Sequence, residues 1–116
     1  MNRLQLYGIK NCDTVRKARK WLEQHQLDYE FMDLREDTLS HELIAQWLTQ
    51  VELDTLVNKK STSWRGLTAE QQDDLNQNSA PQLLMETPTL IKRPVLVTAA
   101  GIHIGFKPAQ YQELLL

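Results

Sequence analysis

The chain has 116 residues, 41% hydrophobic and 24% charged, which is the size and balance of one folded domain and not of a disordered chain. Its formal net charge of −2, from 13 basic and 15 acidic residues, does not favour direct nucleic-acid binding or attachment to an anionic membrane. No apolar run approaches the ~20 residues that span a bilayer, no signal-peptide pattern is present, and the single cysteine can form no internal disulfide, so we expect a cytoplasmic protein.

The N-terminal third is predicted to form a strand, a helix and a second strand. Residues 3–7 alternate leucine with other side chains, as a short strand does. Residues 13–25 contain no glycine or proline and place apolar side chains on one helical face, and residues 28–34 have the composition of a second strand. This order requires a parallel strand pair joined by a right-handed crossover.

The middle of the chain is predicted to be helical. Apolar residues recur at helical spacing over residues 39–51, which predicts one helix there. Two capping-box patterns, Thr68 with Gln71 and Ser79 with Gln82, each predict the start of a short helix. We therefore expect only short helices from residue 52 to residue 86, with Pro88 closing the series.

The C-terminal part is predicted to form a hairpin and a last helix. Residues 95–98 and 102–104 are strand-like and are linked by Ala99-Ala100-Gly101, and Pro108 suits the first turn of a helix over residues 109–116. Together the elements predict an α/β protein of the thioredoxin-like fold. It would be a single domain, residues 1–116, with a mixed four-stranded sheet and a helical insertion at about residues 39–88.

Cys12 is the main candidate for chemistry, because it stands where a strand and loop give way to a helix. Backbone N–H groups at a helix N-terminus lower the pKa of a thiol and favour the reactive thiolate. Arg16, one turn further on, adds positive charge, while the adjacent Asp13 opposes it. The alternative is an inert buried thiol, because free cysteine often packs as a small apolar side chain.

The dipeptide Arg93-Pro94 is the second candidate, because it precedes a predicted strand. In a thioredoxin-like fold a proline here is cis and faces the cysteine loop, so we expect Pro94 to be cis; the alternative is a proline that simply begins a strand. The three histidines show no ligand spacing, so we expect neither a metal site nor a bound cofactor. Basic residues are grouped at 16–20, 59–60 and 92–93, which we interpret as solvated surface.

Several segments together carry a family resemblance over essentially the whole chain. They are residues 7–18 around Cys12, residues 56–60 and 63–67, residues 88–97, and Gly101 with residues 105–108. On these segments the sequence resembles the arsenate reductase (ArsC)/Spx family, and within it the YffB-like subgroup. The resemblance implies a thioredoxin-like fold with an inserted helical subdomain and a cytoplasmic, thiol-based function.

In the arsenate reductases of this family the cysteine attacks arsenate and three arginines hold the oxyanion. Of those arginine positions, this chain has Asn58 at the first, followed by Lys59 and Lys60, then Arg93 at the second and Lys107 at the third. Lysine keeps the charge but loses the two-pronged donor geometry of arginine. Residues 8–11 also differ from the family's His-Asn-Pro-Ala. The departures predict weak arsenate reduction.

The other two branches of the family imply different functions. In Spx regulators the cysteine begins a CxxC switch, which cannot form here because Val15 holds the second position. Spx proteins also bind RNA polymerase, and this stays open as an alternative. YffB-like proteins resemble glutathione-dependent thiol reductases, in which one thiolate attacks a disulfide or thiol adduct and glutathione resolves the mixed disulfide.

The reductase function implies a binding site for glutathione as co-substrate. Its carboxylates would be held by Arg93, Lys107, Lys59 and Lys60. The backbone before Pro94 would pair with the cysteinyl group of glutathione. We expect this function, with glutathione or a thiol-containing substrate as the partner.

Overall fold

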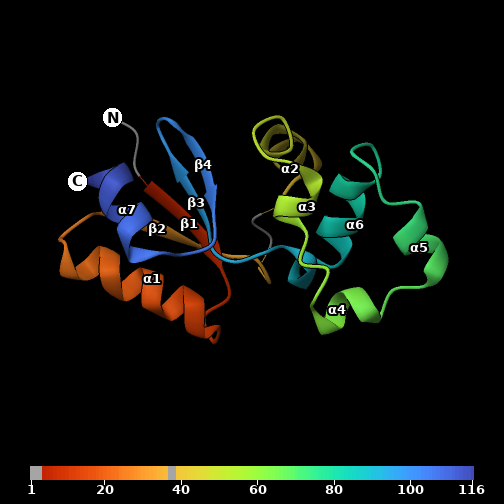
Figure 1. The fold of residues 1–116 in the computed structure, drawn as a ribbon, viewed down its shortest axis with the longest axis horizontal. Helices are drawn as coiled ribbons and strands as arrows, with labels where there is room; N and C mark the ends of the chain where they lie inside the picture. Colours follow the sequence, from red (N-terminus) through yellow and green to blue (C-terminus); the bar gives the residue numbers. More distant parts are fainter. Residues whose placement is uncertain (1–3, 37–38) are drawn as a thin grey trace. The chain divides into compact units, whose positions relative to one another are not determined.

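The computed structural model describes residues 4–36 and 39–116, so Arg3, expected in the first strand, lies outside the described residues (Figure 1). The chain divides into two compact units. We name them the sheet unit, Met1–Glu36 with Arg93–Leu116, and the helical unit, Asp37–Lys92. Within the described ranges, none of the helices has both the length and the apolar composition needed to cross a bilayer.

The sheet unit contains a mixed four-stranded sheet in the order β2-β1-β3-β4. Its elements are β1 (Leu4–Gly8), α1 (Asp13–Gln24), β2 (Tyr29–Asp33), β3 (Val95–Thr98), β4 (Gly101–Ile104) and α7 (Pro108–Leu115). Strand β1 runs parallel to β2 and antiparallel to β3, with Leu6 opposite Phe31 on one side and Leu96 on the other. These elements confirm the predicted fold class and the predicted strand–helix–strand order.

The hairpin of β3 and β4 is tighter than the sequence pattern suggested. Gly101 was expected in the turn, but it is the first residue of β4 and pairs with Thr98. Its φ of 141° lies in a region that residues with a Cβ rarely adopt, which explains why glycine stands at this end of the turn. Pro108 begins α7, as predicted.

The core of the sheet unit lies between the sheet and two helices, α1 and α7, which share one face (Figure 1). Leu6 and Leu96 from the strands meet Ala18 and Leu22 from α1 and Tyr111 from α7, and all five are fully buried. Burying a side chain the size of leucine stabilises a fold by about 1.5–3 kcal/mol. This packing holds α1 rigidly on the sheet and so determines where its N-terminus lies.

The helical unit consists of short helices. They are α2 (His41–Trp47), α3 (Leu53–Leu56), α4 (Thr62–Arg65), α5 (Ala69–Asp73), α6 (Ala80–Glu86) and the 3₁₀ helix η1 (Pro88–Leu90). Pro88 therefore begins a helical turn rather than closing the series. The helix expected over residues 39–51 is shorter, because Ser40 caps it at one end and the Thr49 hydroxyl donates to the carbonyl of Gln46 near the other.

The two predicted capping boxes had different outcomes. At Thr68 the box is complete, with the hydroxyl accepting from the Gln71 N–H at 3.0 Å and the Gln71 side chain accepting from the Thr68 N–H. At Ser79 the predicted helix start is confirmed, because α6 begins at Ala80, but the predicted capping box is absent. The Ser79 hydroxyl donates to the carbonyl of Asp74 at 2.9 Å and accepts from the Asn76 N–H, so it closes the preceding turn and cannot cap α6.

Candidate functional site

Cys12 is the N-cap residue of α1 and follows a tight turn after β1. Its backbone N–H donates to the carbonyl of Ile9 at 3.1 Å, and its carbonyl accepts the N–H of Arg16 at 2.9 Å, the first hydrogen bond of the helix. The turn therefore leads directly into α1 and places the thiol at the helix N-terminus. Cys12 is only partly buried, which leaves it accessible to a reactant and differs from the buried thiol of the alternative interpretation.

The close approach of β1 to α1 depends on Gly8. A Cβ at Gly8 would come within 2.7 and 2.9 Å of the two Cγ atoms of Val15, which is fully buried. Because glycine has no Cβ, the first turn of α1 can pack directly on the end of the strand. Sequence reasoning did not identify this contact, and its only signal was a glycine four residues before Cys12.

The pKa of the Cys12 thiol is lowered from its ordinary value. Partial burial acts in the opposite direction and would raise it, but a hydrogen bond from the Val15 N–H, the hydrogen bond and charge of Arg93, and a hydrogen bond from the Thr14 N–H together outweigh that effect. The backbone at the helix N-terminus and Arg93 thus lower the pKa of the thiol together. Thiolate is the nucleophilic form of cysteine, so the site favours the reactive species.

Arg93 interacts with Cys12 although it lies 81 positions further along the sequence. It stands just before β3, and its guanidinium donates a hydrogen bond to the Cys12 sulfur. The Arg93-Pro94 peptide bond is cis, which confirms that prediction. Pro94 is buried, and its carbonyl accepts the N–H of Gly105 at 2.8 Å, which ties this segment to the end of the β3–β4 hairpin.

Arg16 and Lys107, two other predicted members of the site, are exposed. The Arg16 guanidinium pairs with the carboxylate of Asp13 on the surface of α1, so the two charges offset each other close to Cys12. Lys107 is the N-cap residue of α7. No interaction among the described residues joins Lys107 to Cys12 or Arg93, and its convergence with them stays a prediction.

Asn58, Lys59 and Lys60 belong to the helical unit. The Asn58 side chain accepts the N–H of Lys60 at 3.1 Å and so closes the turn before α4. The Lys59 ammonium lies 2.8 Å from the carboxylate of Asp54 and 5.5 Å from the centre of the Trp64 ring. Lys60 is exposed. Their anion-binding roles stay predictions.

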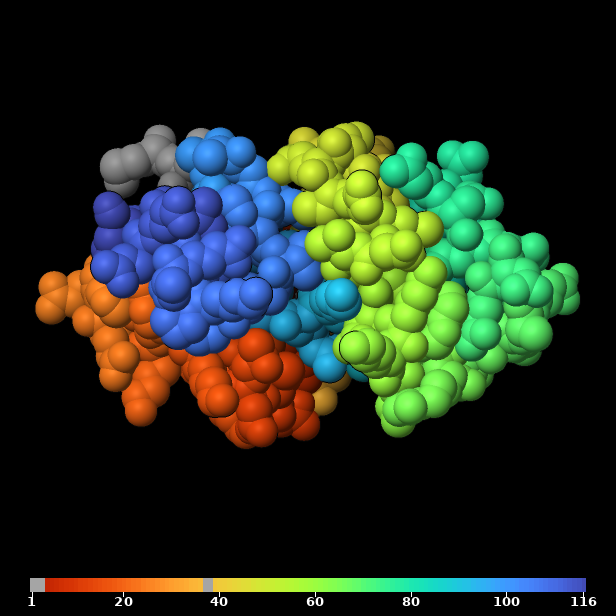
Figure 2. All heavy atoms as spheres, in the orientation of Figure 1, coloured from red at the N-terminus to blue at the C-terminus, as the bar shows by residue number. Residues whose placement is uncertain are grey.

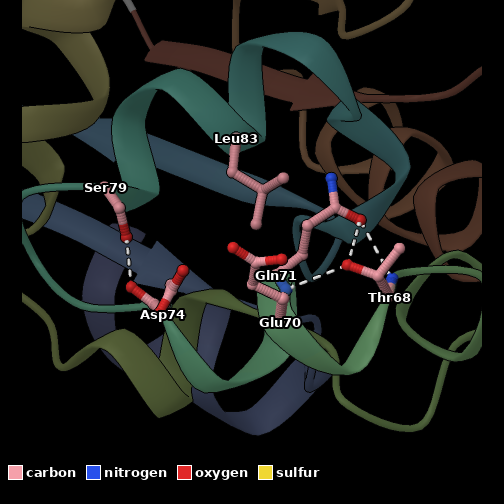
Figure 3. A pocket seen from close by; sticks show the side chains of 6 residues that line it. All are labelled: Thr68, Glu70, Gln71, Asp74, Ser79 and Leu83. Carbon is pink, nitrogen blue, oxygen red and sulfur yellow. Dashed lines mark hydrogen bonds between the residues drawn. The ribbon is translucent and has the colours of Figure 1, made fainter.

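A pocket of about 210 Å³ lies within the helical unit (Figure 3). It is lined by Thr68, Glu70, Gln71, Asp74, Ser79 and Leu83. The polar groups of Thr68, Gln71 and Ser79 are already used in the cap of α5 and the turn before α6. In the part of the chain that the structure describes, no three His, Cys, Asp or Glu side chains are grouped to hold a metal ion.

Comparisons with known proteins agree with this geometry. An uncharacterized protein of Haemophilus influenzae is 44% identical over 109 residues, 94% of this chain and 96% of that one. The solved structure of a protein designated YffB has a TM-score of 0.92 at 37% identity, covering 97% of this chain and 99% of that one. The global transcriptional regulator Spx of Lactiplantibacillus plantarum is 27% identical over 112 residues, 95% of this chain and 84% of the regulator.

The family assignment rests on nearly the full length of the chain. Residues 7–114 match the ArsC family, a range that includes Cys12, Arg93 and Pro94. The YffB structure shares the α/β arrangement of a mixed sheet with helices, which confirms the thioredoxin-like fold. The chain therefore belongs to the ArsC family.

Proposed function

We propose that this protein is a thiol–disulfide reductase that acts through the thiolate of Cys12 and uses glutathione as its reductant. The observation that carries the proposal is the hydrogen bond from Arg93 to the sulfur of a partly exposed cysteine at the N-terminus of α1. Such surroundings stabilise a thiolate while leaving it open to attack a substrate.

In the first step, the Cys12 thiolate attacks the glutathione sulfur of a mixed disulfide between glutathione and a substrate thiol. A bond forms between Cys12 Sγ and that sulfur while the substrate disulfide breaks. The substrate sulfur leaves as a thiolate with the electron pair of the broken bond and takes a proton from water. The substrate is thereby reduced, and Cys12 carries the glutathionyl group.

In the second step, a free glutathione thiolate attacks the glutathionyl sulfur and releases Cys12 as a thiolate. The product is oxidised glutathione, so two glutathione sulfurs end as one disulfide and Cys12 is unchanged. An external thiol is necessary because the chain contains one cysteine and cannot resolve the adduct internally.

Charge would position glutathione in both steps. Its two carboxylates match the cations predicted for the site within the sheet unit, Arg93 and Lys107. The backbone next to Pro94 would pair with the cysteinyl group of the tripeptide. A glutathione-rich cytoplasm is the compartment that this mechanism requires.

The test is turnover with a small disulfide. Wild-type protein with bis(2-hydroxyethyl) disulfide and glutathione should consume glutathione faster than the uncatalysed mixture, and Cys12→Ser should not. Intact-protein mass spectrometry after exposure to oxidised glutathione should show one adduct on the wild type and none on Cys12→Ser. A wild type that stays unmodified, while an unstructured cysteine peptide reacts, would contradict the proposal.

The similarity to Spx supports a second candidate function, a regulator that binds RNA polymerase. The alignment with Spx covers 95% of this chain. Val15, at the second position of the CxxC switch, is fully buried against Gly8, so such binding would not depend on an internal disulfide. Capture of purified RNA polymerase by both wild type and Cys12→Ser, without reductase turnover, would favour the regulator.

A further inference from the structure

The outer face of α1 presents basic side chains that begin beside Cys12. Lys10 lies in the turn before the helix, and Arg16, Lys17 and Lys20 follow on α1; we name these four residues the basic stripe. At 3.6 residues per turn the three helical members fall within an arc of about 100°, opposite the buried side of α1. All four are exposed, and α1 forms part of the surface in Figure 2.

The charges of the stripe are only partly compensated. Asp13, the acidic residue nearest to Lys17 on the helix, pairs with Arg16 instead. Glu23, one turn beyond Lys20, accepts a hydrogen bond from the Tyr29 hydroxyl at 2.6 Å. Across residues 4–36 and 39–116, Lys10, Lys17 and Lys20 have no ion pair, and all three residues are exposed.

Helix stability does not explain this placement. Cations stabilise a helix near its C-terminus and oppose the helix dipole near its N-terminus. In α1 the last turn carries no basic residue, whereas Arg16 and Lys17 stand close to the N-terminal end. The position of the stripe is unfavourable for the helix itself and favourable for an anion that approaches Cys12.

The two units of the chain differ in net charge, and the basic stripe lies on the positive one. Nine of the 13 basic and seven of the 15 acidic residues lie in the sheet unit, which leaves four basic and eight acidic residues in the helical unit. The sheet unit is therefore positive although the chain as a whole is negative. Three uncompensated lysines match a short acidic peptide segment. They match a nucleic-acid backbone less well, because binding there requires many phosphates to be neutralised by lysine and arginine side chains.

We propose that the basic stripe docks an acidic segment of a protein substrate and so directs its disulfide to Cys12. The inference rests on the proposed reductase function and names the substrate class: proteins with acidic residues next to the reactive sulfur. The reaction is the same thiol–disulfide exchange, with a sulfur of the protein substrate in place of the glutathione sulfur as the atom that Cys12 attacks. The Cys12 thiolate forms a bond to one substrate sulfur, the substrate disulfide breaks, and the other sulfur leaves as a thiolate and is protonated by water.

The test compares three peptide disulfides that contain the same reacting disulfide bond and differ only in the charge of the residues beside it. They are symmetric disulfides of short peptides in which the cysteine is flanked by glutamates, serines or lysines. The rate of mixed-disulfide formation with Cys12 is measured by rapid quench and mass spectrometry, and each rate is divided by that of the uncharged thiol N-acetylcysteine amide. At about 20 mM salt we expect the acidic peptide to react roughly tenfold faster than the basic one, and at about 1 M salt the preference should largely vanish.

Charge-reversal variants assign the effect to the stripe. Lys17→Glu and Lys20→Glu should each lower the acidic-to-basic rate ratio roughly threefold, while the serine peptide should react at the wild-type rate. Arg65→Glu, an exposed residue at the end of α4, changes the net charge equally and should leave the ratio unaltered. Glutamate and lysine have similar helix propensities, so these variants should fold.

Each outcome separates this inference from the proposed function. If all three peptides react at the same normalised rate, or if Arg65→Glu lowers the ratio as much as Lys17→Glu does, the docking inference is wrong and the reductase proposal stands. If no peptide reacts with Cys12, the reductase proposal fails and the inference fails with it. The docking inference would also be overturned if the basic stripe binds a short DNA strand but the three peptides react at equal rates.

Discussion

The guanidinium of Arg93 donates a hydrogen bond to the sulfur of Cys12, although the two residues are 81 positions apart in the sequence. The contact forms because β3, which follows Arg93, pairs with β1, which precedes Cys12. One strand pairing thus brings a cation to the thiol.

Replacing Arg93 should make Cys12 less reactive at neutral pH. In Arg93→Met the thiolate loses a charged hydrogen bond, an interaction that contributes roughly 1.5–3 kcal/mol, so the pKa of Cys12 should rise and iodoacetamide alkylation at pH 7 should slow by about tenfold. Arg93→Lys keeps the charge and should recover part of the rate. Each rate is divided by the rate for the same protein unfolded in urea. Equal normalised rates for wild type and Arg93→Met would show that the contact does not lower the pKa of Cys12.

The stability of the protein should depend on pH through Cys12. Because the pKa of this thiol is lower in the folded than in the unfolded chain, its thiolate stabilises the fold at pH above the unfolded pKa, and this contribution is lost as pH falls through the folded pKa. The free energy of unfolding of wild type minus that of Cys12→Ser should therefore be larger at alkaline than at mildly acidic pH. Urea titrations at several pH values measure the difference, and an opposite slope would contradict the lowered pKa.

Gly8→Ala should destabilise the protein and disturb the site together. The new methyl would stand 2.7 Å from a Cγ atom of Val15, and overpacking of this kind costs about 1–3 kcal/mol. The first turn of α1 must move, so the alkylation rate of Cys12 should also change. Thermal unfolding measures the first effect.

The control for Gly8→Ala is the double variant Gly8→Ala/Val15→Ala. Removing both Cγ atoms makes room for the new methyl, so the double variant should be more stable than the sum of the single effects predicts. Additive effects of the two substitutions would show that Gly8 is required for a reason other than its contact with Val15.

The rate of arsenate reduction should depend on which residue stands at position 58, where this chain has Asn58. The family resemblance implies an oxyanion-binding arginine at this position. A charged hydrogen bond contributes roughly 1.5–3 kcal/mol, so Asn58→Arg should increase the rate of arsenate reduction by about tenfold or more. The substitution also removes the side chain that accepts the Lys60 N–H, so Asn58→Ala is the matched control for loss of the turn. No gain over Asn58→Ala would indicate that residues 8–11 limit the reaction instead.

Short-range patterns in the sequence predicted most of the elements near the site. The alternation in β1, the apolar face of α1, the hairpin of β3 and β4 and the cap at Thr68 each depend on residues within a few positions of one another. Cys12 was located for the same reason, because a helix N-terminus is a local feature. The cis bond before Pro94 followed from the predicted topology and the family resemblance rather than from local sequence.

Side-chain partners were decided by the tertiary structure, because a polar group bonds whichever partner the fold brings nearest. Ser79 had the sequence of a capping residue, yet its hydroxyl bonds the carbonyl of Asp74. Arg16 was expected to add charge to Cys12, yet it pairs with Asp13, and Arg93 donates to the sulfur. The sequence by itself determined that a cysteine would stand at the N-terminus of α1, since the start of a helix is a local feature, whereas strand pairing and the missing Cβ of Gly8 decided which groups surround its sulfur.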